Sequence, residues 1–343
     1  MIEQAIKILA EGSDLDVNQA YGAMNQIMEG EATDVQIAAF LIGLRVKGET
    51  ADEMTGGARS LSEKCVRIHP QVPFCVDPVG TGGDRTGTFN ISSTAAIIAS
   101  AAGACVAKHG NRSVSSRSGS ADLFESLGIN IQIPPRAVEM CIEQLGFGFM
   151  FAPVFHPAMR HASSVRRQLG VRTIFNILGP LSNPACAGGQ VLGVYDARIM
   201  PFVARTLVNL GVSRAMIVHG TDGSDEITTT GETLVMEIRD GAITEYLLVP
   251  EDYGLRRSTL TDIQGGSPEE NARITRDILA GRQGPARDVA ILNAAATIYV
   301  GKAAATMAEG IAHAAEAIDS GAAIRQLDRI AAFTQRPENG GIA

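Results

Sequence analysis

Residues 74–110 read FCVDPVGTGGDRTGTFNISSTAAIIASAAGACVAKHG, and this stretch decides the fold class. A short apolar strand, Phe74–Asp77, runs into a glycine-rich turn, Gly80–Asp84. A helix is expected from about Ser92 to Ala102, and a second strand, Cys105–Ala107, follows it. A strand, a helix and a strand in succession predict an α/β domain with a central, mainly parallel sheet flanked by helices.

The same alternation continues toward the C-terminus. A further helix is expected to be capped by Ser120 and to end at Gly128. The other expected strands are Ile129–Ile133, Phe147–Phe151, Gln190–Tyr195 and Ala215–Val218, with a hairpin over 234–249. Residues 159–184 are predicted to be rich in helix, so they interrupt the alternation of strands and helices. The alanine-rich tail over 288–334 is predicted to be helical.

The first seventy residues predict a small all-helical domain. Apolar residues recur at helical spacing over four stretches, and no strand pattern interrupts them. Thr33 with Gln36 and Thr50 with Glu53 match capping boxes at the starts of the third and fourth helices. We therefore expect a helical domain over residues 1–72, followed by the α/β domain.

Bulk properties restrict the possible partners. Of 343 residues, 45% are hydrophobic and 19% are charged, which is ordinary for a folded protein with a core. A formal net charge of -8 argues against broad binding to nucleic acid, although a small anion can still be bound locally. No membrane span or targeting segment is recognisable, and five widely spaced cysteines without a CxxC fit free thiols, so we expect a cytoplasmic protein.

The glycine loop Gly80–Asp84 is the first candidate binding element. Glycines at the end of a strand let backbone N–H groups approach an anion, and the next helix adds partial positive charge. The loop is neither a Walker A motif nor a dinucleotide fingerprint, because Arg85 stands where the last glycine of the fingerprint would be. Alone, it is as compatible with a structural turn. Asp84 favours a binding loop, since a carboxylate there suits a metal or a ribose hydroxyl.

The run Asn90-Ile91-Ser92-Ser93-Thr94 begins the following helix. Plain helix capping explains it equally well when it is taken alone. Beside the glycine loop, its surplus of hydroxyl groups suits a phosphate or metal shell, and Ser92 is the hydroxyl that we place on a magnesium ion.

A second polar segment, KHGNRSVSS at 108–116, follows the second strand and continues into Arg117-Ser118-Gly119-Ser120. Lys108 supplies a point charge, and Arg112 can bind phosphate oxygens with two donors at once. A merely solvated loop would seldom combine these residue types, so phosphate binding is favoured.

The acidic run Asp222-Gly223-Ser224-Asp225-Glu226 follows a strand that ends near His219-Gly220. Adjacent carboxylates at a strand end suit Mg²⁺, which keeps several waters and is held by one or two carboxylates plus substrate phosphates. An acidic turn explains the run if it stands alone; two phosphate loops nearby favour the metal.

A fifth segment contains His156, His161, Arg166 and Arg167. A solvated helix face and a satisfied loop histidine explain these residues without a function. An arginine beside an apolar pocket can instead bind a substrate carboxylate with two hydrogen bonds.

Together these segments resemble the anthranilate phosphoribosyltransferases. The matching stretches are GTGGD at 80–84, NISS at 90–93, KHGNRSVSS at 108–116, SGSAD at 118–122, RTIFNILGPLSNPA at 172–185 and the DE pair at 225–226. They follow the family's order and spacing over essentially the whole chain. KHGNR and NILGPLSNP are specific, whereas the DE pair alone is not. Ser224 departs from the family, which commonly has an apolar residue before DE.

The resemblance implies the fold of the fourth structural class of phosphoribosyltransferases. Residues of about 165–186 then rejoin the helical domain, and the α/β domain comprises 73–164 and 187–343. It also implies a homodimer joined through the helical domains.

The resemblance further implies two substrates, phosphoribosyl pyrophosphate and anthranilate, and two Mg²⁺ ions per active site. The residues that look like the phosphoribosyl pyrophosphate site are Gly80, Gly83, Asp84, Thr88, Asn90, Ile91, Ser92, Ser93, Thr94, Lys108, His109, Gly110, Asn111, Arg112, Ser113, Val114, Ser115, Ser116 and Ser120. Gly80, Asn111 and Arg166 look like anthranilate contacts. Ser92, Asp225 and Glu226 look like magnesium ligands.

The implied reaction, in tryptophan biosynthesis, is attack of the anthranilate amine on C1 of the ribose with departure of pyrophosphate. No residue is needed as a covalent nucleophile, and His109 shapes the anthranilate pocket or helps the proton to leave. Two alternatives stay open. A pyrimidine nucleoside phosphorylase-like enzyme shares the architecture but has a different phosphate loop, and a non-enzymatic nucleic-acid-binding relative would have a basic surface and altered metal ligands.

Overall fold

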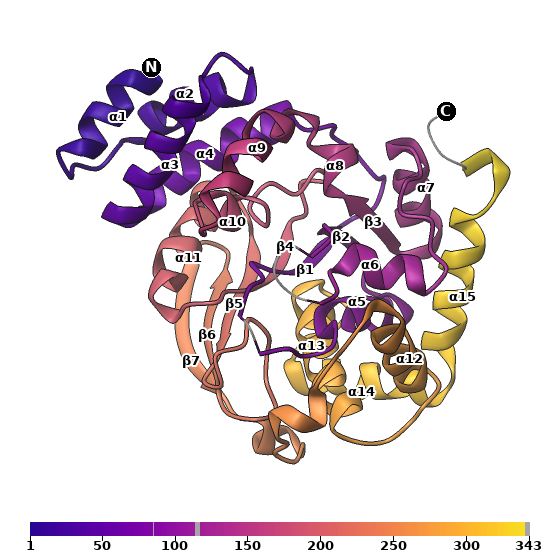
Figure 1. Cartoon of the computed structure of the whole chain (residues 1–343). Coiled ribbons are helices and arrows are strands. Elements are labelled where there is room, and N and C mark those ends of the chain that lie inside the picture. Colours follow the sequence, from indigo (N-terminus) through magenta and orange to yellow (C-terminus); the bar gives the residue numbers. More distant parts are fainter. Residues whose placement is uncertain (85, 114–116, 340–343) are drawn as a thin grey trace.

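The computed structural model describes residues 1–84, 86–113 and 117–339. A group of N-terminal helices stands on one side of a larger unit that is built around a single sheet (Figure 1). The predicted combination of a helical bundle with an α/β unit is therefore confirmed. In the described part of the chain, no helix is both long and apolar enough to cross a membrane.

The helical group consists of four helices, as the sequence predicts. They are α1 (Ile2–Ala10), α2 (Val17–Met28), α3 (Asp34–Lys47) and α4 (Ala51–Lys64). Both predicted capping boxes are present: Thr33 accepts a hydrogen bond from the Gln36 N–H, and Thr50 accepts one from the Glu53 N–H. Asp16 forms a third capping box at the start of α2. Such caps satisfy backbone donors that the first helical turn leaves without partners.

Two later helices pack onto this group. They are α9 (Arg160–Leu169) and the short α10 (Phe175–Leu178). Val165 and Phe175 belong to the same buried cluster as Met24 and Phe40 of the N-terminal helices. The chain thus returns to the helical group after the third strand, and the connection from α9 to α10 lies between the two parts of the molecule.

The sheet has seven strands in the order β3-β2-β1-β4-β5-β6-β7. The strands are β1 (Val76–Gly80), β2 (Val106–Gly110), β3 (Phe147–Phe151), β4 (Gly189–Gly193), β5 (Arg214–Gly220), β6 (Thr233–Arg239) and β7 (Ala242–Leu248). The first five pair in parallel, and β6 and β7 form the predicted antiparallel hairpin at one edge.

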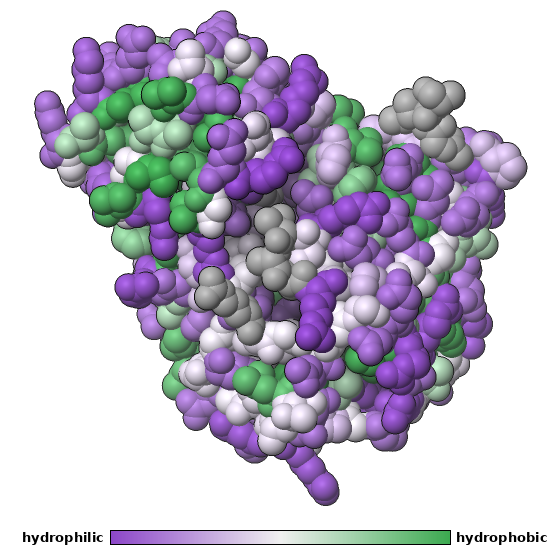
Figure 2. Space-filling view, viewed as in Figure 1, coloured by the Kyte–Doolittle hydropathy of each residue, from purple (hydrophilic) through white to green (hydrophobic). Residues whose placement is uncertain are grey.

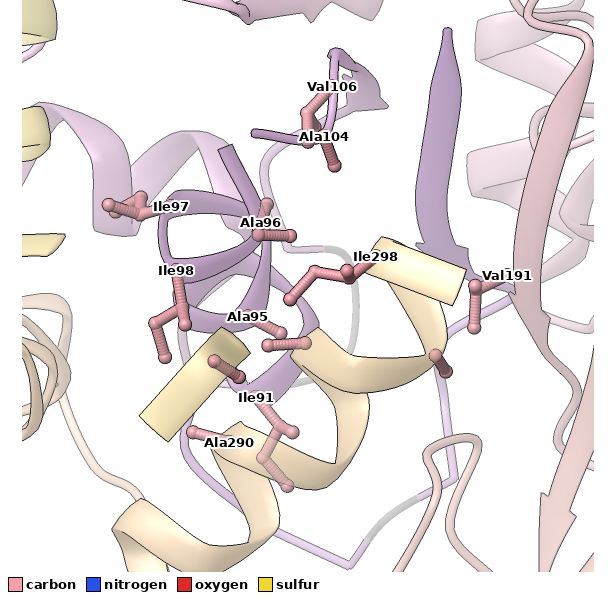
Figure 3. Close-up of a cluster of buried hydrophobic side chains, with 14 of the residues drawn as sticks. Ile91, Ala95, Ala96, Ile97, Ile98, Ala104, Val106, Val191, Ala290 and Ile298 are labelled. Atoms are coloured by element: carbon pink, nitrogen blue, oxygen red, sulfur yellow. The ribbon is translucent and has the colours of Figure 1, made fainter. Parts of the chain in front are cut away.

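Helices cover both faces of the sheet. On one face lie α5 (Ile91–Ala101) and α13 (Pro285–Val300), packed side by side through small residues such as Ala95 and Ala290 (Figure 3). Along β4, Val191 belongs to the core of this face and Leu192 to the core shared with the helical group, because successive strand residues point to opposite faces.

The remaining helical elements surround these layers. They are α6 (Ser120–Ser126), α7 (Pro135–Leu145), α8 (Ala152–Phe155), α11 (Met200–Asn209), α12 (Pro268–Leu279), α14 (Met307–Asp319) and α15 (Ala322–Thr334), with short 3-10 turns at Pro157–Met159, Ala197–Ile199, Pro250–Tyr253, Leu260–Ile263 and Pro337–Asn339. The helical tail predicted from residue 288 is confirmed.

The strand predicted at Ile129–Ile133 is wrong. Ile129, Ile131 and Ile133 are all buried, which produces the alternating pattern, but the segment is a connection between α6 and α7. The N–H of Ile129 bonds to the Phe124 carbonyl, and the N–H of Asn130 bonds to the Thr334 side chain. These donors are therefore satisfied without a sheet ladder, and burial alone created the strand-like period.

Three predicted boundaries also shift. Strand β2 continues to Gly110, so Lys108, His109 and Gly110 are strand residues and not part of the loop that the sequence predicts. Helix α5 begins at Ile91, and α6 is preceded by Gly119, so Ser120 is its first helical residue and not its cap.

Gly56 provides a test of the helical packing. A Cβ atom at Gly56 would overlap the Val17 carbonyl oxygen and lie 2.7 Å from the Tyr21 nitrogen, both in the backbone of α2. Gly56→Ala should therefore lower the free energy of unfolding by about 1–3 kcal/mol, although alanine favours helix. Gly179→Ala is the matched control, because its nearest neighbour is 3.9 Å away. Equal unfolding midpoints in urea for the two variants would contradict this packing.

Candidate active site

The candidate site lies where the parallel strands end. Strand β1 ends at Gly80, β2 at Gly110, β4 at Gly193 and β5 at Gly220. The carboxyl ends of parallel strands meet at one edge of a sheet, so the loops that follow them are neighbours. The space-filling view shows a recess in the surface where the helical group meets the larger unit (Figure 2).

The glycine loop is in direct contact with the acidic loop that follows β5. The N–H of Gly82 donates to Oδ2 of Asp225 at 2.6 Å. A Cβ at Gly80 would lie 2.5 Å from the same oxygen, and a Cβ at Gly193 would overlap the Asp225 carbonyl oxygen. Glycine at positions 80 and 193 is therefore needed for the acidic loop to approach these strand ends. The geometry is compatible with the hypothesis that the glycine loop and the acidic loop act together.

Asp225 and Glu226 are carboxylates with little compensation from positive charge. Burial, together with the nearby charge of Asp84, raises the pKa of Asp225 to about 7. Burial and the charge of Asp225 raise the pKa of Glu226 to about 8. The Ser92 N–H at the start of α5 donates to Oε1 of Glu226 at 3.0 Å. Three acidic side chains and the start of a helix therefore converge on this point.

Lys108 lies beneath the acidic groups as a buried counter-ion. Its ammonium group donates to the Pro78 carbonyl at 2.5 Å, and the residue is 2% exposed. Burial lowers the pKa of Lys108, and the charges of Asp77, Glu226 and Asp225 oppose that shift. The charge of Lys108 thus acts on Asp77, Asp225 and Glu226 from the interior of the protein.

Asp77 holds the base of the site together. It accepts hydrogen bonds from the His109 N–H at 3.1 Å and from Nδ2 of Asn183 at 2.6 Å. Burial raises the pKa of Asp77 to about 6, against the lowering effect of Lys108. Asp77 and Asn183 are residues that the sequence analysis did not single out, although both stand inside or beside matched motifs.

Asn90 joins the two predicted phosphate segments. Its Nδ2 donates to the Ser118 carbonyl at 3.0 Å, and its Oδ1 accepts from the Ser118 hydroxyl at 3.0 Å. Asn271 of α12 donates to the same Oδ1 at 2.9 Å. Thr88, two residues earlier, pairs with Gln264 in an isolated bridge. The structure thus brings the segments 88–90 and 118–120 together.

Three predicted residues of this region have buried side chains. Ile91 is part of the core, Ser93 is 1% exposed, and the Thr94 hydroxyl hydrogen-bonds with Thr275 at 2.9 Å. Of the run 91–94, Ser92 is the residue whose backbone reaches the acidic pair. The remaining side chains are buried where α5 packs against its neighbours.

Arg112 is paired within its own unit. Its guanidinium contacts Asp122 at 3.0 Å and binds both carboxylate oxygens of Glu125 on α6. The Ser113 N–H also donates to Asp122, and the Ser120 hydroxyl donates to the Asn111 carbonyl at 3.3 Å. Arg112 is therefore held by carboxylates in this structure. The predicted residues Val114, Ser115 and Ser116 lie outside the described residues.

Two buried, uncharged histidines lie next to each other beside this edge. The rings of His109 and His156 have centroids 4.9 Å apart, and Nδ1 of His109 is 3.2 Å from the Gly179 carbonyl. Burial lowers the pKa of His109 to about 3 and that of His156 to about 4, so both rings are neutral at pH 7. The Nε2 atoms of both rings are buried without a hydrogen-bond partner among the described residues.

Arg166 projects from α9 and lies over the ring of Phe175, 5.1 Å from its centroid. Burial lowers the pKa of its guanidinium, and within the described ranges it makes no ion pair. It also makes no hydrogen bond there with Gly80 or Asn111, the other two predicted anthranilate contacts. Within the described residues, its hydrogen-bond donors therefore have no acceptor.

The acidic pair fits a hard divalent cation better than a soft one. Oxygen atoms of Asp225, Glu226 and Ser92 are the donors that Mg²⁺ prefers, and the raised pKa values indicate that positive charge is lacking there. Over 1–84, 86–113 and 117–339, no three His, Cys, Asp or Glu side chains are arranged as a ready-made metal site. A Mg²⁺ ion would therefore need further oxygen ligands from water or phosphate.

The chain matches two family models along most of its length. Residues 3–65 match the helical bundle domain of a glycosyl transferase family, and residues 73–324 match the a/b domain of the same family. The anthranilate phosphoribosyltransferase of Acetivibrio thermocellus is 51% identical over 334 residues, which are 97% of each chain.

Solved structures agree with this match. The anthranilate phosphoribosyltransferase of Thermus thermophilus is 44% identical with a TM-score of 0.92, covering 97% of this chain and 99% of that one. The enzyme of Saccharomyces cerevisiae in complex with PRPP and Mg is 30% identical with a TM-score of 0.88, and the alignment covers 97% of both chains. The same yeast enzyme has also been solved with 4-fluoroanthranilate. By its two domains and its full-length relatives, this chain belongs to the anthranilate phosphoribosyltransferases of that glycosyl transferase family.

Proposed function

We propose that this chain transfers the 5-phosphoribosyl group from phosphoribosyl pyrophosphate to the amine of anthranilate, releasing pyrophosphate, in tryptophan biosynthesis. The match to an anthranilate phosphoribosyltransferase over 97% of both chains is the observation that carries this proposal. The geometry of the loop edge supports it, because the glycine loop and the acidic loop are in direct contact there and both members of the acidic pair are carboxyl groups with raised pKa values.

The donor would bind along the loops that follow β1 and β2. Gly80, Gly83 and Asp84 lie at the end of β1, and Asn90 fastens that segment to Ser118. Backbone N–H groups of such loops bind phosphate oxygens well, and the start of α5 adds partial positive charge. Predicted site residues with buried side chains stay in the proposed donor site, because they hold these loops in place.

Two Mg²⁺ ions per site are part of the proposal, held by Ser92, Asp225 and Glu226 together with water and diphosphate oxygens. When bound, they would neutralise the charge that develops on the departing pyrophosphate. Asp225 accepts a hydrogen bond from the Gly82 N–H. Its carboxylate would therefore connect the glycine loop, which would bind the diphosphate, to the group of metal ligands.

The acceptor would bind between the histidines and Arg166. A flat aromatic ring suits the uncharged rings of His109 and His156, and the guanidinium of Arg166 suits the carboxylate. A pKa of about 3 makes His109 a poor general base at neutral pH. The amine of anthranilate is itself weakly basic and attacks C1 of the ribose unprotonated, so His109 would serve to shape the pocket.

The proposal extends to the organisation of the protein. We assign residues 1–72 and about 165–186 to the helical domain, because α9 and α10 share its core. Met1, Val35 and Val46 of that domain are exposed, which favours a homodimer joined through it. Hydrophobic residues also reach the surface over the helical group in the space-filling view (Figure 2). The five cysteines are free thiols, as expected for a protein that acts in the cytoplasm.

One assay tests the proposed reaction. The protein is mixed with anthranilate, phosphoribosyl pyrophosphate and Mg²⁺, and the loss of anthranilate fluorescence is followed. We expect fluorescence to fall with release of one pyrophosphate per anthranilate, and EDTA to abolish the change because the leaving group is no longer neutralised. Folded protein that leaves the fluorescence unchanged, or that instead splits pyrimidine nucleosides with phosphate, would overturn the proposal.

Arg166 should determine the affinity for anthranilate. Arg166→Ala removes a guanidinium that has no ion-pair or hydrogen-bond partner within the described part of the protein, so it should raise the KM for anthranilate by about tenfold or more and affect the donor less. Arg167→Ala is the matched control, because Arg167 is its exposed neighbour on α9. Steady-state kinetics with each substrate varied in turn make the comparison, and equal losses for both substrates would contradict the assignment.

A further inference from the structure

Arg172 lies across the junction between the two parts of the molecule. It stands in the connection between α9 and α10, directly after the turn at Gly170, so it comes from the side of the helical group. Its guanidinium nevertheless reaches the glycine loop of the larger unit. A Cβ built on Gly83 would lie 2.6 Å from Nη2 of Arg172 and 3.1 Å from Cζ.

The guanidinium is oriented by an aromatic ring that is tied to the same loop. Cζ of Arg172 lies 4.1 Å from the centroid of the Tyr195 ring. The Tyr195 N–H donates to the Thr81 hydroxyl at 3.2 Å, so this ring and the glycine loop are fastened together. A guanidinium stacked on a ring keeps its N–H donors available along its edge, which is the arrangement that binds phosphate oxygens with two hydrogen bonds.

Arg172 has no acceptor of its own in the part of the chain that the structure describes: its recorded contact is with the Tyr195 ring, and it makes no ion pair or hydrogen bond there. The acid nearest in the loop sequence, Asp84, accepts the hydroxyl of Thr86 at 2.5 Å instead. Arg112, in contrast, is already held by two carboxylates. In a chain with net charge -8, a preoriented arginine without a carboxylate beside an anion-binding loop indicates that its acceptor is a ligand.

We propose that Arg172 binds an oxygen of the diphosphate group of the phosphoribosyl donor, in addition to the loop residues that the family motifs identify. This inference rests on the proposed function. The diphosphate is the favoured group because Gly82, next to Gly83, already contacts Asp225 of the expected metal site. Since Arg172 belongs to the connection between α9 and α10, binding of the diphosphate would also hold the helical group against the glycine loop.

The test is a titration that does not depend on turnover. Inorganic pyrophosphate with Mg²⁺ is titrated calorimetrically into the full-length protein, and ribose 5-phosphate is titrated separately. Arg172→Gln should weaken the affinity for pyrophosphate by about tenfold or more, the size expected when a hydrogen bond to a charged group is lost, and leave that for ribose 5-phosphate unchanged. Arg167→Gln, the same change at an exposed position five residues earlier, should alter neither affinity.

Further variants keep the inference testable if Arg172→Gln is poorly folded. Arg172→Lys retains the charge but not the two-donor fork, and Tyr195→Leu removes the ring that orients the guanidinium. Both should give pyrophosphate affinities between those of the wild type and Arg172→Gln. An unchanged pyrophosphate affinity, a loss confined to ribose 5-phosphate, or a rise in the KM for anthranilate alone would overturn the inference. The two titrations need no turnover and only the KM comparison needs an active wild type, so failure of the proposed function, seen in the fluorescence assay, is recognised separately.

Discussion

The structure depends on the close contact between the loop after β5 and the ends of β1 and β4. A side chain at Gly193 would overlap the Asp225 carbonyl, and one at Gly80 would press on the Asp225 carboxylate, so two strand ends must be glycine for the acidic loop to lie there. The Gly82 N–H then holds that carboxylate. Because of this contact, residues separated by more than a hundred positions in the chain form one site. From the same loop, Glu226 accepts the Ser92 N–H at the start of α5.

The second consequence is an excess of buried negative charge. Asp77, Asp225 and Glu226 are buried or nearly so, with Asp84 close by, and the single buried ammonium group of Lys108 compensates their charge only in part. Burial raises the pKa of each of the three buried carboxyl groups, which means that the ionised forms lack compensating charge. A divalent cation supplies that charge, and a diphosphate brought with it supplies the remaining oxygen ligands. The excess of buried negative charge, which is unfavourable in the free protein, therefore favours binding of the divalent cation together with the diphosphate.

Much of the fold could be predicted because local signals were strong. The capping boxes at Thr33 and Thr50 lie at the starts of their helices, and the glycines of β1, β2, β4 and β5 lie at the ends of those strands, so each is close in sequence to the element that it bounds. The errors arise where contacts between residues far apart in the sequence determine the local structure or the partner of a side chain. Ile129 and its neighbours alternate because they are buried between α6 and α7, and Asn130 is satisfied by Thr334 at the other end of the chain. Similarly, the pairing of Arg112 with Glu125 and the position of Arg172 on Gly83 follow from tertiary packing, which the motifs do not encode.

The central claim is that the acidic loop and the glycine loop form one binding site because β4 ends in glycine. Its most direct test is the affinity for phosphoribosyl pyrophosphate with Mg²⁺, measured calorimetrically for Gly193→Ala against Gly189→Ala. The control lies on the same strand, but its new Cβ would meet the side chains of Phe74 and Val300, which can shift. Displacement of Asp225 should weaken binding by about tenfold or more in Gly193→Ala and much less in the control. Folded Gly193→Ala protein that binds as tightly as the wild type would contradict the account.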